Sequence, residues 1–108
     1  MKYAIVISVS KTSFGPIVFR EDLKRNIIKA KKIGYDGVEL AVKKPELINV
    51  NEVKKILEET SMVILAVGTG QLYFDEGLSF SDPDIHIRNE AVKRTCRIIT
   101  SMFLPTRF

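Results

Sequence analysis

The chain has 108 residues, of which 45% are hydrophobic and 28% charged, a composition typical of a globular protein and not of a disordered one. The length allows one domain at most. Seventeen Lys and Arg side chains against 13 acids give a modest net charge of +4, and because the basic residues gather on helical stretches without interleaved aromatics, we expect solvated helix faces and no nucleic-acid partner.

The first predicted element is a strand from Tyr3 to Val9, an almost unbroken apolar run rich in β-branched residues. Such a run is typical of a strand that is covered on both faces in a parallel sheet. It is too short to span a membrane, and no small-residue cleavage site follows it, so we expect no membrane association and a cytoplasmic protein. A helix is predicted from Glu21 to Ile33, where apolar residues recur at helical spacing, and Gly34 ends it.

The middle of the chain repeats this order. A short strand is predicted over Gly37 to Val42, before Pro45. Asn51 is the predicted N-cap of a helix that runs to about Thr60. The apolar run from Met62 to Gly68 then has the same signature of a buried strand as the first one.

The last predicted element is a helix with Asp82 as its N-cap and Pro83 at its first position, where the missing N–H costs nothing. Its expected buried stripe consists of Ala91, Val92, Thr95, Cys96, Ile99 and Met102. Cys96 is the only cysteine, which excludes an internal disulfide and a zinc site built on thiolates. We interpret it as a buried packing thiol.

The predicted order is therefore strand, helix, strand, helix, strand, helix. Alternation of this kind is typical of βαβ units with right-handed crossovers, so the predicted fold class is α/β with a parallel sheet.

The segment between the third strand and the last helix, Val67 to Asp84, does not fit a phosphate-binding loop. Gly68 and Gly70 occupy the first two glycine positions of a dinucleotide-binding motif, but Tyr73 occupies the third, and the helix begins too late. A Walker motif is absent from the sequence as well. The segment is too apolar to be disordered. Because loops at the carboxyl ends of parallel strands carry ligand sites, we interpret it as one wall of a pocket; the alternative is a loop that only packs on its neighbours.

Three motifs together resemble a known family. They are GYDGVEL at Gly34 to Leu40, GTGQ at Gly68 to Gln71, and GLSFSDPDIHIRNEAV starting at Gly77. In this combination the chain resembles the amino-terminal part of the sugar isomerase/epimerase family, the xylose-isomerase-like TIM barrels. The resemblance covers residues 1–100, and residues 101–108 form a divergent tail.

The resemblance implies that the chain is a truncated (βα)3 parallel-strand segment of a TIM (βα)8 barrel. Family members bind a divalent metal ion (Mn, Mg, Co or Zn), which polarises the sugar carbonyl so that a carboxylate base can remove a neighbouring proton. The family's metal ligands and paired glutamates lie on later strands, so no catalytic or metal-ligating residue is expected here. We expect the isolated chain to be inactive and to self-associate through its open sheet edges.

Five residues are predicted to contact a sugar substrate. Glu39 is a carboxylate near the end of a strand among apolar residues, where burial is costly unless the group binds something; the alternative is an ion pair with a lysine. Gly70 and Gln71 follow the third strand directly and offer close approach to the backbone and an amide for hydrogen bonding. Ser79 and Phe80 are expected to wall the pocket, with the aromatic ring stacking on a sugar face.

Two further residues are expected to have other roles. His86, the only histidine, is predicted at the surface, and Arg88 is predicted to anchor the loop by pairing with Asp82 or Asp84.

Two other functions remain open. One is a metal-dependent nuclease barrel related to endonuclease IV, although the expected histidine after the third strand is missing. The other is a non-catalytic remnant that acts only when another chain completes it.

Overall fold

The computed structural model describes residues 1–13 and 15–103. Its centre is a four-stranded sheet in which all strands are parallel and lie in the order β2-β1-β3-β4. The strands are β1 (Ala4–Ser8), β2 (Phe19–Arg20), β3 (Gly37–Ala41) and β4 (Val63–Gly68). The helical elements are α1 (Leu23–Ile33), the 3₁₀ turn η1 (Pro45–Leu47), α2 (Val50–Thr60), α3 (Gln71–Phe74) and α4 (Ile85–Phe103). The predicted α/β class with a parallel sheet is therefore confirmed.

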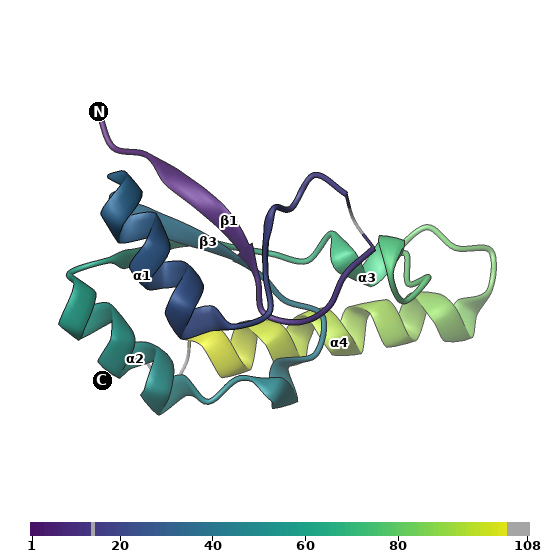
Figure 1. Cartoon of the computed structure of the whole chain (residues 1–108). Helices are drawn as coiled ribbons and strands as arrows, with labels where there is room; N and C mark the ends of the chain where they lie inside the picture. The colour runs from purple at the N-terminus through teal and green to yellow at the C-terminus, as the bar shows by residue number, and fades with distance from the viewer. Residues whose placement is uncertain (14, 104–108) are drawn as a thin grey trace.

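All three long helices lie on one face of the sheet (Figure 1). Their buried side chains, including Ile27 of α1, Ile56 of α2 and Ile98 of α4, form one core cluster with alternate residues of the strands, among them Ile7 and Leu40. This cluster is the hydrophobic core, and it fixes α1, α2 and α4 as a single layer against the sheet.

The other face of the sheet carries no long helix in the described part of the chain. Because side chains alternate along a strand, the partners Val6, Glu39 and Ala66 point to this second face. Val6 and Glu39 are half-buried there, and Ala66 is exposed. We call this surface the open face.

The prediction that the third strand is fully covered is wrong. In β4, Val63 is 48% exposed and Leu65 is 55% exposed. A register shift between Val38 and Glu39 places Leu65 as an extra residue in β4. β4 is also the last strand of the sheet, so one of its edges has no neighbour among the described residues.

Helix caps explain where the helices begin and end, and two predicted caps are wrong. For α2 the cap is Asn49, not Asn51: the Asn49 side chain accepts a hydrogen bond from the Glu52 amide at 3.2 Å. For α4 it is Asp84, not Asp82: Asp84 Oδ1 accepts from the His86 amide at 2.8 Å, while Asp82 accepts from the Asp84 amide and so closes the turn before the helix.

The termination of α1 by Gly34 is confirmed. Gly34 adopts a left-handed conformation with φ of 113°, and its amide donates to the carbonyl of Ala30.

The buried stripe of α4 differs from the prediction. Ala91, Ile98 and Met102 are buried, whereas Val92 and Ile99 are about half exposed and Cys96 is exposed. The helix carries apolar residues on two neighbouring stripes, and the sheet covers the one that contains Ile98. Cys96 is therefore not a buried packing thiol. α4 extends to Phe103, and residues 104–108 of the predicted tail lie outside the described residues.

Within the described ranges, no helix combines the length and the apolar character that crossing a membrane requires.

Candidate functional site

Polar side chains gather at the edge of the sheet where the parallel strands end. The segment after β1 supplies Thr12 and Ser13, the segment after β3 supplies Lys43, and the segment after β4 supplies Gln71 and Asp75. This is the edge at which parallel α/β sheets bind ligands. The strands bring these residues together although they are far apart in the sequence.

A buried polar pair closes the end of β1. Ser8 is 0% exposed and Gln71, the first residue of α3, is 1% exposed. Gln71 Nε2 donates to Ser8 Oγ at 2.7 Å, and Ser8 Oγ donates to the carbonyl of Ser10 at 2.6 Å. Gln71 Oε1 is buried and has no hydrogen-bond partner among residues 1–13 and 15–103, which is an energetically costly position for an amide oxygen.

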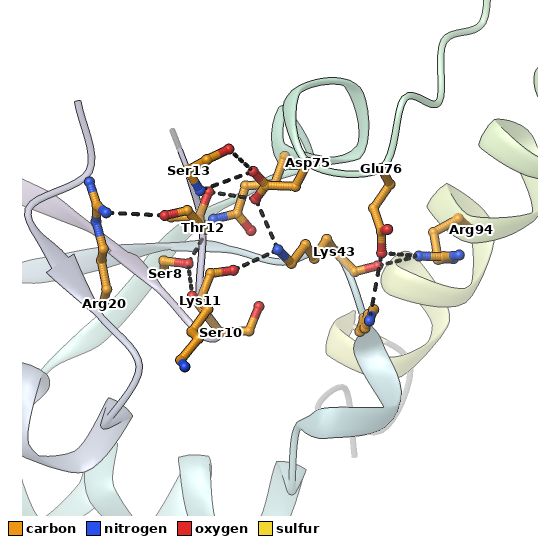
Figure 2. Close-up of polar contacts among 12 residues, drawn as sticks. Ser8, Ser10, Lys11, Thr12, Ser13, Arg20, Lys43, Asp75, Glu76 and Arg94 are labelled. Carbon is orange, nitrogen blue, oxygen red and sulfur yellow. Dashed lines mark hydrogen bonds and ion pairs between the residues drawn. The ribbon is translucent and has the colours of Figure 1, made fainter. Parts of the chain in front are cut away.

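The Asp75 carboxylate is the centre of the second polar group, which we call the Asp75 clamp (Thr12, Ser13, Lys43 and Asp75; Figure 2). Oδ2 accepts hydrogen bonds from Thr12 Oγ1 at 2.5 Å and from Lys43 Nζ at 2.9 Å. Oδ1 accepts from the Ser13 amide at 3.1 Å and from Ser13 Oγ at 2.8 Å. Lys43 Nζ also donates to the carbonyl of Lys11 at 2.6 Å, so the clamp ties the segment after β1 to β3 and α3.

Charge in the clamp is shielded from water. The Asp75 side chain is 6% exposed and that of Lys43 is 13% exposed. Desolvation raises the pKa of Asp75, but the hydrogen bonds from Thr12, Lys43 and Ser13 outweigh it and hold the pKa of this carboxyl well below its ordinary value. Asp75 is therefore ionised at neutral pH, and this strongly stabilised anion is a poor proton donor and a poor base.

An open cleft of about 500 Å³ adjoins the clamp and is lined by Lys11, Thr12, Ser13, Lys43 and Asp75, among others. Arg20 organises its rim, because its guanidinium donates to the carbonyls of Ile17, Thr12 and Gly15 at 2.6, 3.0 and 3.3 Å.

A second ion-pair network attaches α4 to this edge of the sheet. Arg94 donates to the carbonyl of Lys43 at 3.0 Å and to Glu76 Oε1 at 3.3 Å (Figure 2). Lys44 also lies 3.9 Å from Glu76 Oε1. The side chain of Lys43 binds Asp75, and the backbone carbonyl of Lys43 is in turn bound by Arg94 of α4.

The five predicted substrate residues do not all meet. Glu39 lies in the middle of β3, on the open face, and its carboxylate makes no hydrogen bond or ion pair with the described residues. It lies next to β4, since a Cβ at Gly68 would be 2.8 Å from Glu39 Oε1. Gly70 and Gln71 lie at the carboxyl edge, where Gly70 is exposed and Gln71 is buried.

Ser79 and Phe80 are in a different place. They line a pocket of about 170 Å³ with Leu72 of α3 and Ala91 and Thr95 of α4. Phe80 is 60% exposed. The structure therefore separates these two residues from the cleft beside the Asp75 clamp.

The two residues with other predicted roles are found as follows. His86 is exposed, which confirms its surface position. Arg88 anchors the loop, but through the backbone carbonyls of Asp82 at 2.7 Å and Pro83 at 3.2 Å rather than through a carboxylate.

Sequence reasoning missed Thr12, Ser13, Lys43 and Asp75. Their one sequence signal is position, since each lies shortly after a predicted strand. Residues 1–13 and 15–103 contain no group of three or more His, Cys, Asp or Glu side chains placed to hold a metal ion.

Comparison with models of known protein families gives no match, and comparison with curated proteins gives none either. The class of protein that the fold defines is thus an α/β protein with a parallel sheet, helices on one face and a polar cluster at the carboxyl edge of its strands.

Proposed function

We propose that the chain forms the first three strand–helix units of a TIM-type barrel of the sugar isomerase/epimerase family, with the open face as the barrel interior. One observation carries this proposal. The three longer strands β1, β3 and β4 lie side by side in chain order, and the helices between them lie on one face only, while the two-residue β2 lies on the other side of β1. A doubly wound sheet reverses the order of its long strands and has helices on both faces, whereas a barrel does neither.

In this proposal the substrate is a sugar, and the reaction is a proton transfer next to its carbonyl. Glu39 projects from the open face and, as a carboxylate without a partner among the described residues, accepts hydrogen bonds from sugar hydroxyls. Gly70, which is exposed, contacts the sugar at the carboxyl edge, and Gln71, which is buried, supports this edge through its hydrogen bond to Ser8. Ser79 and Phe80 line the separate pocket behind α3 and are not part of this substrate surface.

The reaction also requires groups that the described residues do not supply. A divalent metal ion would polarise the carbonyl, and two glutamates would move the proton. We propose that further strands provide the metal ligands and these glutamates. Three barrel strands alone cannot close a barrel, so the 108-residue chain is expected to show no epimerisation of ketoses with added Mn²⁺ or Mg²⁺.

The exposed edge of β4 also supports self-association of the chain. Val63 and Leu65 are exposed apolar residues on the last strand of the sheet. An apolar edge strand without charged residues readily pairs with another strand. We propose that this edge of β4 takes a further strand, from additional barrel segments or from a second copy of the chain.

A chimera tests the function. Residues 1–100 replace the first three strand–helix units of an active ketose 3-epimerase, and epimerisation is measured for the chimera and for its Glu39→Gln variant. Loss of one charge-assisted hydrogen bond, worth about 1.5–3 kcal/mol, lowers kcat/KM by at least about tenfold. Glu58→Gln, on the exposed surface of α2, is the matched control and leaves kcat/KM unchanged. An active chimera whose Glu39→Gln variant keeps full kcat/KM would contradict the assignment of Glu39 to the substrate surface.

A further inference from the structure

The donors of the Asp75 clamp form an unusually complete set for one small anion. Thr12 and Ser13 supply hydroxyls, Ser13 also supplies its amide, and Lys43 supplies an ammonium group. All four hydrogen bonds end on the two oxygens of one carboxylate, and all four donor atoms come from outside the segment that carries Asp75.

Proteins bind carboxylates and phosphates with this combination of donors. A cationic side chain, a free backbone amide and hydroxyl groups each donate to an oxyanion, and the bonds to a charged acceptor are about twice as strong as neutral ones. The donors are also prepositioned, because Lys43 Nζ is held by the carbonyl of Lys11 and the segment of Thr12 is held by Arg20.

The donors are also close to solvent. Thr12, Ser13 and Lys43 line the open cleft of about 500 Å³, a volume in the range of small-molecule sites. Lys11 lines it too, and its ammonium group has no partner in the described part of the chain. An external anion can therefore approach these donors through the cleft.

We propose that the donors of Thr12, Ser13 and Lys43 form a binding site for an external oxyanion, a carboxylate or a phosphate group, and that Asp75 occupies this site in the free protein as an internal ligand (Figure 2). This inference does not depend on the barrel or on sugar chemistry. In this proposal the Asp75 carboxylate blocks the binding site in the free protein. An anionic ligand binds the same donors when Asp75 is absent or displaced.

The test is chemical rescue of Asp75→Ala. This variant keeps the four donors but removes the internal carboxylate. Its thermal unfolding is followed by circular dichroism in acetate, in inorganic phosphate and in chloride at equal ionic strength. An anion that binds only the folded state at ten times its dissociation constant raises the ratio of folded to unfolded protein about 11-fold. We expect a saturable rise of the melting temperature in acetate, in phosphate or in both, but not in chloride, and the effective anion identifies the ligand class.

Three comparisons make the result decisive. Adding Lys43→Met or Thr12→Val to Asp75→Ala should abolish the rescue, since each removes a donor. Glu58→Ala, on the exposed surface of α2, should show no anion-specific rise. If Asp75→Ala is unfolded in chloride, the same comparison is made on the recovery of helical signal when acetate or phosphate is added. Equal behaviour of Asp75→Ala in acetate, phosphate and chloride, whether folded or unfolded, would overturn the proposal.

Discussion

The Asp75–Lys43 ion pair offers the sharpest test of the energetics at the carboxyl edge. Asp75→Asn replaces the carboxylate by a neutral amide of the same shape and leaves the Lys43 ammonium, 13% exposed, without its counter-ion. Breaking a buried ion pair from one side costs about 3–5 kcal/mol. We expect the lower end, about 3 kcal/mol, because Lys43 keeps its bond to the Lys11 carbonyl and the cleft admits water.

That loss is a large share of the stability of a small domain, which is typically about 5–15 kcal/mol. It corresponds to a fall in melting temperature of about 12 °C or more for a domain of this size. Lys43→Met should cost less, about 2 kcal/mol, because Asp75 keeps the three hydrogen bonds from Thr12 and Ser13. In the double variant neither charge is left unpaired, so the two losses should not add.

The assay is urea unfolding of the four proteins, followed by circular dichroism because the chain has no tryptophan. We expect the double-mutant cycle to give a coupling free energy of at least about 1.5 kcal/mol. The matched control is the cycle of Lys44→Met and Glu76→Gln, whose ion pair is long at 3.9 Å and 47% and 26% exposed. Its coupling should stay below about 1 kcal/mol. Additivity of the Asp75 and Lys43 losses within about 0.5 kcal/mol would refute the reasoning.

Three further predictions concern other parts of the fold. The folded pKa of Asp75 lies below the unfolded value of about 3.9, so its stabilising contribution is present above that pH and is lost as the pH falls. The fall in the free energy of unfolding at acid pH should therefore be less steep in Asp75→Asn than in the unmodified protein. An unchanged pH dependence would contradict the lowered pKa of Asp75. Gly37→Ala places a Cβ 2.7 Å from the Val63 carbonyl oxygen and should lower the free energy of unfolding in urea by about 1–3 kcal/mol. Gly70→Ala should leave it unchanged, because beyond its chain neighbours no described atom lies within 4 Å of the added Cβ. Equal effects of the two variants would contradict the close approach of β3 and β4. Leu65→Lys should reduce self-association in analytical ultracentrifugation, while Val92→Lys, on the exposed side of α4, should not; equal sedimentation of the two variants would rule out the β4 edge as the contact.

The regular elements were predictable because their signals are local. Apolar runs identify β1, β3 and β4, and helical periodicity identifies α1, α2 and α4, all to within a few residues. The two-residue strand β2 and the four-residue helix α3 are too short to show a period, so the sequence does not reveal them. The N-caps of α2 and α4 each lie two residues from the predicted position. In both cases an identical residue type stands at both positions, Asn49 and Asn51 for α2 and Asp82 and Asp84 for α4, so the sequence does not decide which one caps the helix.

The candidate site was predictable only in part. Its placement at the carboxyl edge follows from the parallel sheet, and Gln71 follows from its position after β4. The Asp75 clamp could not be predicted from the sequence, because Thr12 and Asp75 are 63 residues apart and Lys43 and Asp75 are 32 apart. Such pairs become visible only when the strand order is known. The predicted burial of Cys96 is wrong for a related reason. α4 has two apolar stripes, and only its packing against the sheet determines which of them is buried.

The account depends on helices that cover one face of the sheet formed by β1, β3 and β4, while the other face carries no long helix among the described residues. Thiol labelling tests it directly in a Cys96→Ala background, with single cysteines at Ala66 on the open face and at Val38, which is 0% exposed on the helix face. We expect the cysteine at position 66 to react with a thiol reagent nearly as fast as a free thiol in the dilute monomer, and the one at position 38 to react only on unfolding. Equal protection of both positions in the monomer would contradict the account.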